Sequence, residues 1–227
     1  MAIAKVAKMA NSTALAIPGM PGSSKEDEAA LTAPRESSGG LAILSLMQSV
    51  SDPVKKNQPS GIRAGDYLLG RNDILKTVRA VVGVSRPRAV YIDSGEVQSE
   101  SYDTKSAEWE KIVALKKHGK NGARYGLEFL LWLPDHGQFA QLGFFNTARE
   151  RGADMIAARD AKKMVTLSAE LVDGKSFSWH LPVVDQVENP GAVAMPSAEQ
   201  TEAALAFFEA YKQQQQTQTQ AGGELPF

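Results

Sequence analysis

The chain of 227 residues contains no cysteine. This absence excludes disulfide bonds, thiolate catalysis and cysteine-ligated zinc sites. No stretch approaches the roughly 18 uninterrupted apolar residues that a membrane-spanning helix needs. Lys8 and the polar residues 11–13 interrupt the apolar N-terminus, which therefore makes a poor signal peptide. We expect a protein of the reducing cytoplasm with no membrane partner.

Signatures of catalysis are also scarce. The three histidines, His118, His136 and His180, lie far apart, and none belongs to a His-Glu-x-x-His metal motif. Gly119-Lys120 lacks the earlier glycine and the following Ser or Thr of a phosphate-binding loop, and the carboxylates form no tight cluster of the two-metal nuclease kind. We expect a non-enzymatic protein without cofactor or metal. A nuclease with a dispersed site remains an alternative.

The net charge of −1 hides a modest asymmetry along the chain. Residues 61–187 carry 18 Lys and Arg against 16 Asp and Glu, a net +2. Residues 188–227 carry one Lys against five Glu, a net −4. A mildly basic body beside an acidic tail is compatible with a nucleic-acid partner, although the average charge alone argues against one.

Composition divides the chain into four parts. Residues 1–60 predict a flexible arm, because residues 19–40 are rich in Gly, Pro, Ser and Ala; within it, the apolar residues 41–50 predict a short helix that ends near Asp52-Pro53. The remaining parts are a folded domain over 61–190, a helix over 191–212 that Ser197 caps, and a flexible glutamine-rich linker with a terminal tip over 213–227.

Short β-branched runs separated by turn residues fill the domain. The predicted strands are 74–84 and 89–92, divided by a turn around Ser85-Arg86-Pro87, then 124–133, 139–145, 164–172 and 176–187, the last two joined by a turn at Asp173-Gly174. A helix over 147–163, with Asn146 as N-cap, separates the two hairpins. This order favours a mainly β fold, an OB-like barrel with one inserted helix. An open sheet with extra strands fits nearly as well.

Alternation along residues 124–133 assigns the aromatic side chains to faces. Tyr125 and Phe129 share the wholly apolar face and are expected in the core. Phe177 and Trp179, which alternate with Leu181 and Val183, are expected there too. Trp132 lies on the mixed face with Arg124 and Glu128, where the pattern fits an exposed stacking ring or a ring half-buried under the helix.

The chain ends in Glu224, Leu225, Pro226 and Phe227 after a stretch rich in Gln and Gly, residues 213–223. The terminal carboxylate and Glu224 could pair with basic residues at the edge of a partner's binding pocket, and Phe227 could fill the apolar pocket itself. Pro226 limits the conformational entropy lost on binding. These features predict a peptide that docks on a partner protein.

This ending resembles that of bacterial-type single-stranded DNA-binding proteins, which close a Gly- and Gln-rich linker with an acidic tip and Ile-Pro-Phe or a similar triplet. The resemblance implies an OB fold that binds single strands and a tail that recruits enzymes of replication, recombination and repair. The tip departs from that pattern because Glu224 stands alone where the family carries several aspartates. The body matches no motif of the bacterial domain, and its run 127–132 looks more like a diverged, phage-encoded version.

Strand binding needs cations for phosphates and aromatic faces on which bases stack. The candidate contacts are Arg79, Arg86 and Arg88 around the first predicted turn, and Trp109, Lys111, Lys116, Lys117, Lys120, Arg124 and Trp132. Residues 116–122 predict a mobile basic loop between strands. An ordinary solvated helix and loop explains the lysines equally well.

These patterns together predict a cytoplasmic single-stranded DNA-binding protein of replication, recombination and repair, acting in a bacterial host if a bacteriophage encodes it. Phosphate neutralisation and base stacking would hold the strand, and the tip would recruit partner enzymes. A structural or assembly β-barrel without a nucleic-acid role is the alternative from another class. Both readings leave the formation of homo-oligomers open.

Overall fold

The computed structural model describes residues 41–94, 96–115, 122–187 and 192–221, and from residue 211 onward only the path of the backbone. Its strands are β1 (Ala42–Leu46), β2 (Tyr67–Leu69), β3 (Asp73–Leu75), β4 (Val78–Asp93), β5 (Glu96–Ser101), β6 (Gly122–Leu133), β7 (Gln138–Phe145), β8 (Met164–Asp173) and β9 (Ser178–Val187). Its helices are α2 (Asp52–Lys56), α3 (Ala107–Ala114), the 3₁₀ helix η1 (Asn146–Arg151), α4 (Gly152–Asp160) and α5 (Ala198–Ala221).

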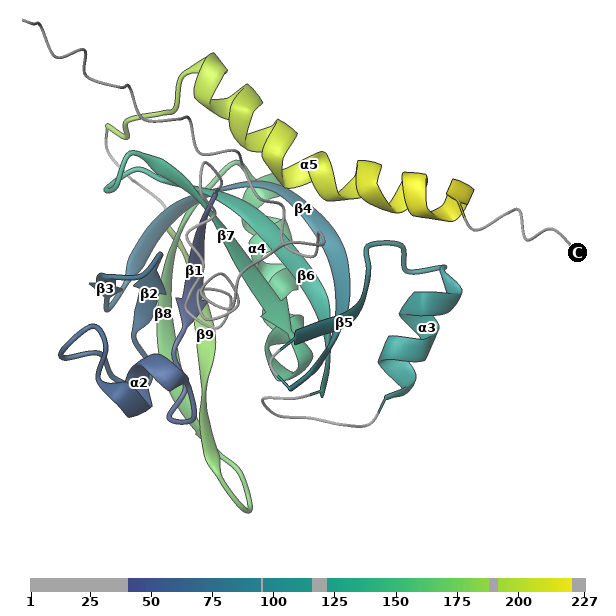
Figure 1. Cartoon of the computed structure of the whole chain (residues 1–227). Coiled ribbons are helices and arrows are strands. Elements are labelled where there is room, and N and C mark those ends of the chain that lie inside the picture. The colour runs from purple at the N-terminus through teal and green to yellow at the C-terminus, as the bar shows by residue number, and fades with distance from the viewer. Residues whose placement is uncertain (1–40, 95, 116–121, 188–191, 222–227) are drawn as a thin grey trace, which may run out of the picture. The chain divides into compact units, whose positions relative to one another are not determined.

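The strands form one strongly curled sheet of nine strands (Figure 1). Their order is β3-β2-β1-β7-β6-β4-β8-β9, and β5 pairs with β4 beside this path. All pairs are antiparallel except β1 and β7, which run parallel. The fold is mainly β, as predicted, and the curled sheet is consistent with a small OB-like barrel.

Strand β4 connects the two halves of the sheet, because it pairs with β5, β6 and β8. It runs without a break through residues 85–87, so the predicted turn there is wrong. The register against β6 shifts instead: Val82 pairs with Leu131 and Ser85 with Phe129. An extra residue on one strand of a pair bends that strand. The bend lets one long strand follow the curl of the sheet.

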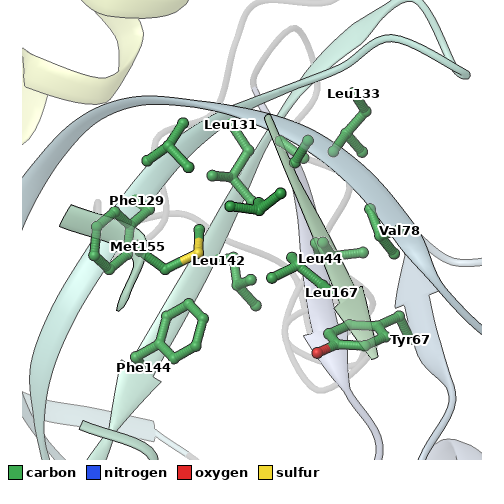
Figure 2. Close-up of a cluster of buried hydrophobic side chains, with 14 of the residues drawn as sticks. Leu44, Tyr67, Val78, Phe129, Leu131, Leu133, Leu142, Phe144, Met155 and Leu167 are labelled. Carbon is green, nitrogen blue, oxygen red and sulfur yellow. The ribbon is translucent and has the colours of Figure 1, made fainter. Parts of the chain in front are cut away.

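The concave face of the sheet holds the main hydrophobic core (Figure 2). The predicted alternation of β6 is confirmed there, because Phe129, Leu131 and Leu133 are all fully buried in this core. Phe129 meets Phe144 edge to face, with ring centroids 5.5 Å apart and planes at 86°. Helix α4 adds Met155 to the same cluster. The inserted helix therefore completes the core.

The helix predicted over 147–163 is confirmed as η1 followed by α4, but Asn146 does not cap it. Phe145 occupies the N-cap position, and Asn146 adopts a left-handed conformation with φ of 52°. Its side-chain Oδ1 accepts from the Tyr125 N–H at 3.3 Å, and its Nδ2 donates to the Ala123 carbonyl at 3.3 Å. Asparagine tolerates this backbone conformation better than most residues. Asn146 therefore ties the end of β7 to the beginning of β6.

The sheet begins earlier in the chain than the sequence predicted. Residues 41–50 do not form a helix: they contain strand β1, which pairs with β7 through Ala42 and Ile43. Leu44 is buried in the main core, and this burial favours a strand because it locks β1 against the sheet. The predicted domain boundary at residue 60 therefore cuts through the folded unit.

Helix α5 confirms the predicted cap and corrects the predicted linker. The Ser197 Oγ accepts from the Gln200 N–H at 3.1 Å, and the Gln200 Oε1 accepts from the Ser197 N–H at 2.9 Å, which is a reciprocal capping box. The helix then continues through residues 213–220, which were expected to be a flexible linker. Glutamine is a good helix former, so the tract extends a helix already begun.

Side-chain hydrogen bonds bring the two ends of the curled sheet together. The Gln48 amide, just after β1, donates from Nε2 to the His180 carbonyl at 2.8 Å and accepts from the His180 N–H through Oε1 at 2.8 Å. The Tyr67 hydroxyl of β2 donates to the Ser168 carbonyl of β8 at 2.9 Å. Gln48 thus takes the place of a neighbouring strand at one residue of β9.

Replacing Gln48 with alanine removes both hydrogen bonds to His180. We expect Gln48→Ala to lower the free energy of unfolding by about 1–3 kcal/mol, since each bond contributes about 0.5–1.5 kcal/mol. Gln186→Ala, on the same strand but exposed, is the matched control and should change little. Urea unfolding followed by circular dichroism measures both. Equal stability of the two variants would contradict this account of the closure.

Candidate nucleic-acid interface

The convex face of β4, β5 and β6 gathers a group of charged side chains, which we call the arginine cluster. The strand registers bring them together: Arg86 pairs with Glu128, and Val90 pairs with both Arg124 and Glu100. Residues two apart on a strand share a face. The cluster therefore consists of Arg86, Arg88, Glu100, Tyr102, Arg124 and Glu128, with Phe208 of α5 packed against it.

Arg86 is the buried centre of this cluster, with a side chain only 3% exposed. Its Nε and Nη2 donate to Glu128 Oε2 at 2.8 and 2.6 Å, and its Nη1 donates to the carbonyl of Phe208. The guanidinium lies 4.5 Å from the Tyr102 ring centroid and 4.1 Å from that of Phe208. The prediction that Arg86 contacts phosphate is therefore wrong, because its side chain is buried and its donors are occupied. Arg86 instead fastens α5 to the sheet.

Arg88 lies at the edge of the cluster, with its side chain 27% exposed. Its Nε donates to Glu100 at 2.5 Å and its Nη1 to Glu128 at 2.9 Å. Burial disfavours its charge, but the two carboxylates outweigh this and raise the pKa of Arg88 above its ordinary range. The carboxylates of Glu100 and Glu128 therefore both form ion pairs with Arg86 or Arg88.

Arg124 is the third arginine and has no such partner. Among the described residues, none forms an ion pair or hydrogen bond with its guanidinium, although its side chain is partly buried. Burial and the positive charge of Arg88 lower its pKa. The cluster thus holds three arginines against two glutamates. Its unbalanced positive charge lies at Arg124, where an incoming anion would be stabilised.

Arg79, another predicted phosphate contact, lies outside the arginine cluster. Arg79 is exposed and forms a bidentate ion pair with Asp135, in which its Nε donates at 2.8 Å. Its guanidinium lowers the pKa of the Asp135 carboxyl. Arg79 therefore meets a phosphate only in competition with a carboxylate.

The sequence did not predict helix α3 as an element distinct from the basic loop. The packing of this helix changes the role expected for Trp109. Ser106 caps this helix by accepting from the Trp109 N–H at 3.1 Å, and the indole packs in a small cluster with Ile112 and Ala123. Trp109 and Tyr125 are both half-buried in this cluster rather than in the main core. Lys111 is 74% exposed. Lys116, Lys117 and Lys120 lie outside the described residues.

Trp132 is buried, so it offers no face to a base. It is 5% exposed, and its Nε1 donates to the Ala194 carbonyl at 2.7 Å. Its ring packs against Phe139 with centroids 5.1 Å apart. The cover comes from the segment before α5 and not from the helix between the hairpins. The expectation of an exposed stacking ring is therefore wrong, and the alternative of a ring half-buried under the inserted helix is right about burial but not about what covers the ring.

The exposed aromatic ring lies where the sequence placed a core residue. Phe177, in the connection between β8 and β9, is 70% exposed, and the expectation that it lies in the core is wrong. Trp179 is half-buried and also lies outside the core clusters. The connection is longer than predicted, because β8 ends at Asp173 and β9 begins at Ser178. Strands β8 and β9 have ten residues each, whereas strands usually have five or six. This unusual length was the available sign that the hairpin extends beyond the core.

Comparison with known proteins found no match among family models, curated proteins or solved structures. Within the described residues, no group of three or more His, Asp or Glu side chains is arranged to hold a metal ion. No helix in that same part of the chain has the length and apolar character needed to cross a membrane. The terminal tip, Glu224 to Phe227, lies outside the residues that the structure describes.

Arg86 and Arg79 provide a matched pair of arginines for testing burial. Arg86→Ala should lower the free energy of unfolding by about 3–5 kcal/mol, because it leaves Glu128 buried without its main partner. Arg79→Ala should cost far less, since solvent screens an exposed ion pair. Chemical denaturation of both variants gives the comparison. A similar small loss in each would show that the buried contact is not structural.

Proposed function

We propose that this chain is a single-stranded DNA-binding protein that holds the strand by phosphate neutralisation with little base specificity. The observation that carries the proposal is Arg124: a partly buried guanidinium, next to Arg88, with no acidic partner among the described residues. Such a group is destabilised by its own surroundings. A bound phosphate would remove that penalty, because a charge-assisted bond to an anion favours the charged form.

Further cations precede Arg124 in the sequence. Strand β6 begins at Gly122, and Lys120 precedes Arg124 by four residues, so the backbone between them spans at most roughly 14 Å. Lys116 and Lys117 come just before. A series of cations along one segment suits the regular spacing of phosphates, which a single small anion would not require. This arrangement favours a polyanion as the ligand.

The resemblance of the C-terminal ending to that of bacterial-type single-stranded DNA-binding proteins supports the choice of single strands among polyanions. In this proposal the tip Glu224 to Phe227 recruits enzymes of replication, recombination or repair. The body binds the strand and the tip binds the partner. These two activities are separable by mutation.

Arg124→Gln should weaken binding of a fluorescent oligo(dT) and reduce the slope of log affinity against log salt by about 0.7, the share of one phosphate on a single strand. Arg79→Gln is the control, because Asp135 already neutralises Arg79. Anisotropy titrations from low to high salt measure both. The proposal fails if the wild-type chain does not bind oligo(dT) at low salt, or if its binding does not weaken as salt rises.

Deleting residues 222–227 should leave oligo(dT) affinity intact or tighter, because it removes the acidic Glu224 and the terminal carboxylate from competition with the strand. The same deletion should abolish capture of a replication or repair enzyme that the full chain retains in a pull-down. Phe227→Ala in the full chain is the point-mutant control. Retained capture by both variants would contradict the role of the tip.

A further inference from the structure

The hairpin of β8 and β9 extends beyond the core of the protein. Figure 1 shows its end projecting past the rest of the sheet. Val165, Leu167 and Val184 are its members in or against the main core. Farther along, Leu171 is 59% exposed and Phe177 is 70% exposed. The end of this hairpin therefore contributes nothing to the core, although it carries apolar and aromatic residues.

Local contacts hold the end of the hairpin in one shape. The Gly174 N–H donates to the Phe177 carbonyl at 3.0 Å, and the Ser178 hydroxyl donates to Asp173 at 2.6 Å. A Cβ atom at Gly174 would lie 2.5 Å from Cζ3 of Trp179 and 2.8 Å from the Phe177 carbonyl oxygen. Only glycine therefore allows the indole to pack over the turn. These contacts hold the turn that carries both aromatic residues.

Phe177 and Trp179 form one aromatic unit at this end. Their ring centroids are 5.4 Å apart and their planes are inclined at 50°. The indole Nε1 of Trp179 is buried without an acceptor among the described residues, which leaves an unpaired donor beside the exposed ring. Ser176, Ser178 and Lys175 surround the pair in sequence. The unit is small, aromatic and bordered by polar groups.

Strand addition by a second copy is a poor fit to this hairpin. Gln48 binds the main-chain N–H and carbonyl of His180 on the outer side of β9. Main-chain groups of residues two apart point to the same side of a strand, so Pro182 also faces that side. Proline has no N–H to donate, and this weakens an exposed strand edge as a template for pairing. The side chains, and not the strand edge, are what this hairpin offers.

We propose that the end of the β8–β9 hairpin is a base-stacking site, in which a base of single-stranded DNA stacks on Phe177, supported by Trp179, while Lys175 meets a neighbouring phosphate. This inference rests on the proposed function and assigns it a second contact, on a different strand pair from Arg124. A flat exposed ring with a cation close by in sequence suits a nucleotide, whose base is apolar on its faces and whose phosphate is anionic. A protein partner would need a wider contact area than one small aromatic unit provides.

The test compares Phe177→Ala and Leu171→Ala by anisotropy with oligo(dT). Stacking of a base predicts a loss of roughly 5- to 150-fold for Phe177→Ala, with Phe177→Tyr close to wild type. Leu171→Ala should be neutral, because it removes another exposed apolar side chain of the same hairpin that has no ring. Both variants should fold normally, which circular dichroism melting checks. Oligo(dT) should also quench tryptophan fluorescence in the wild type, and less in Trp179→Phe.

The outcomes separate the two proposals. If the wild-type chain does not bind oligo(dT), the proposed function itself fails. If Arg124→Gln weakens binding but Phe177→Ala and Phe177→Ala/Trp179→Ala do not, the strand-binding function stands and the stacking site is wrong. If Phe177→Ala changes the oligomeric state in light scattering and leaves the affinity intact, the aromatic unit is a contact between copies, and the stacking site is again overturned.

Discussion

The buried contact between Arg86 and Glu128 is the constraint on which the convex side of this protein depends. A guanidinium is costly to remove from water, so it is stable there only with its donors occupied and its faces covered. Glu128 and the carbonyl of Phe208 occupy the donors, and the rings of Tyr102 and Phe208 cover the faces. The position of α5 and the shape of the neighbouring surface follow from this requirement. The charge of Arg124 is left without a carboxylate for the same reason, because the two glutamates of the cluster pair with Arg86 and Arg88.

The bend in β4 links this polar face to the core. On one side of the register shift, Val78, Ala80 and Val82 line the main core; on the other, Ala89 packs beneath α3. Arg86 lies just past the shift and faces away from the core. One strand thus serves two hydrophobic clusters and an ionic one. A regular strand of the same length would not follow the curl that brings Gln48 to His180.

Local patterns in the sequence predicted the fold better than the site. Alternation identified the faces of β6, turn residues identified both hairpins, and composition identified the helix between them. Alternation gives the face of a residue but not what covers that face. Arg86 and Trp132 were therefore taken for surface contacts, although α5 and Ala194 cover them from far along the chain. Phe177 was misplaced for the opposite reason, because its strand continues past the core. Arg124 was identified by charge alone, and its lack of a partner became visible only once the strands were paired.

The helical conformation of the glutamine tract changes the mechanics of the chain's end. Helix α5 has 24 residues and is about 36 Å long, of which roughly 20 Å lies beyond Phe208, its point of attachment to the sheet. The six residues that follow span at most about 21 Å when fully extended. The helix therefore acts as a spacer, and the tip reaches the level of Phe208 only when these six residues are nearly fully extended. A helical spacer thus weakens the competition of the tip for its own arginine cluster, compared with a flexible tether of the same number of residues.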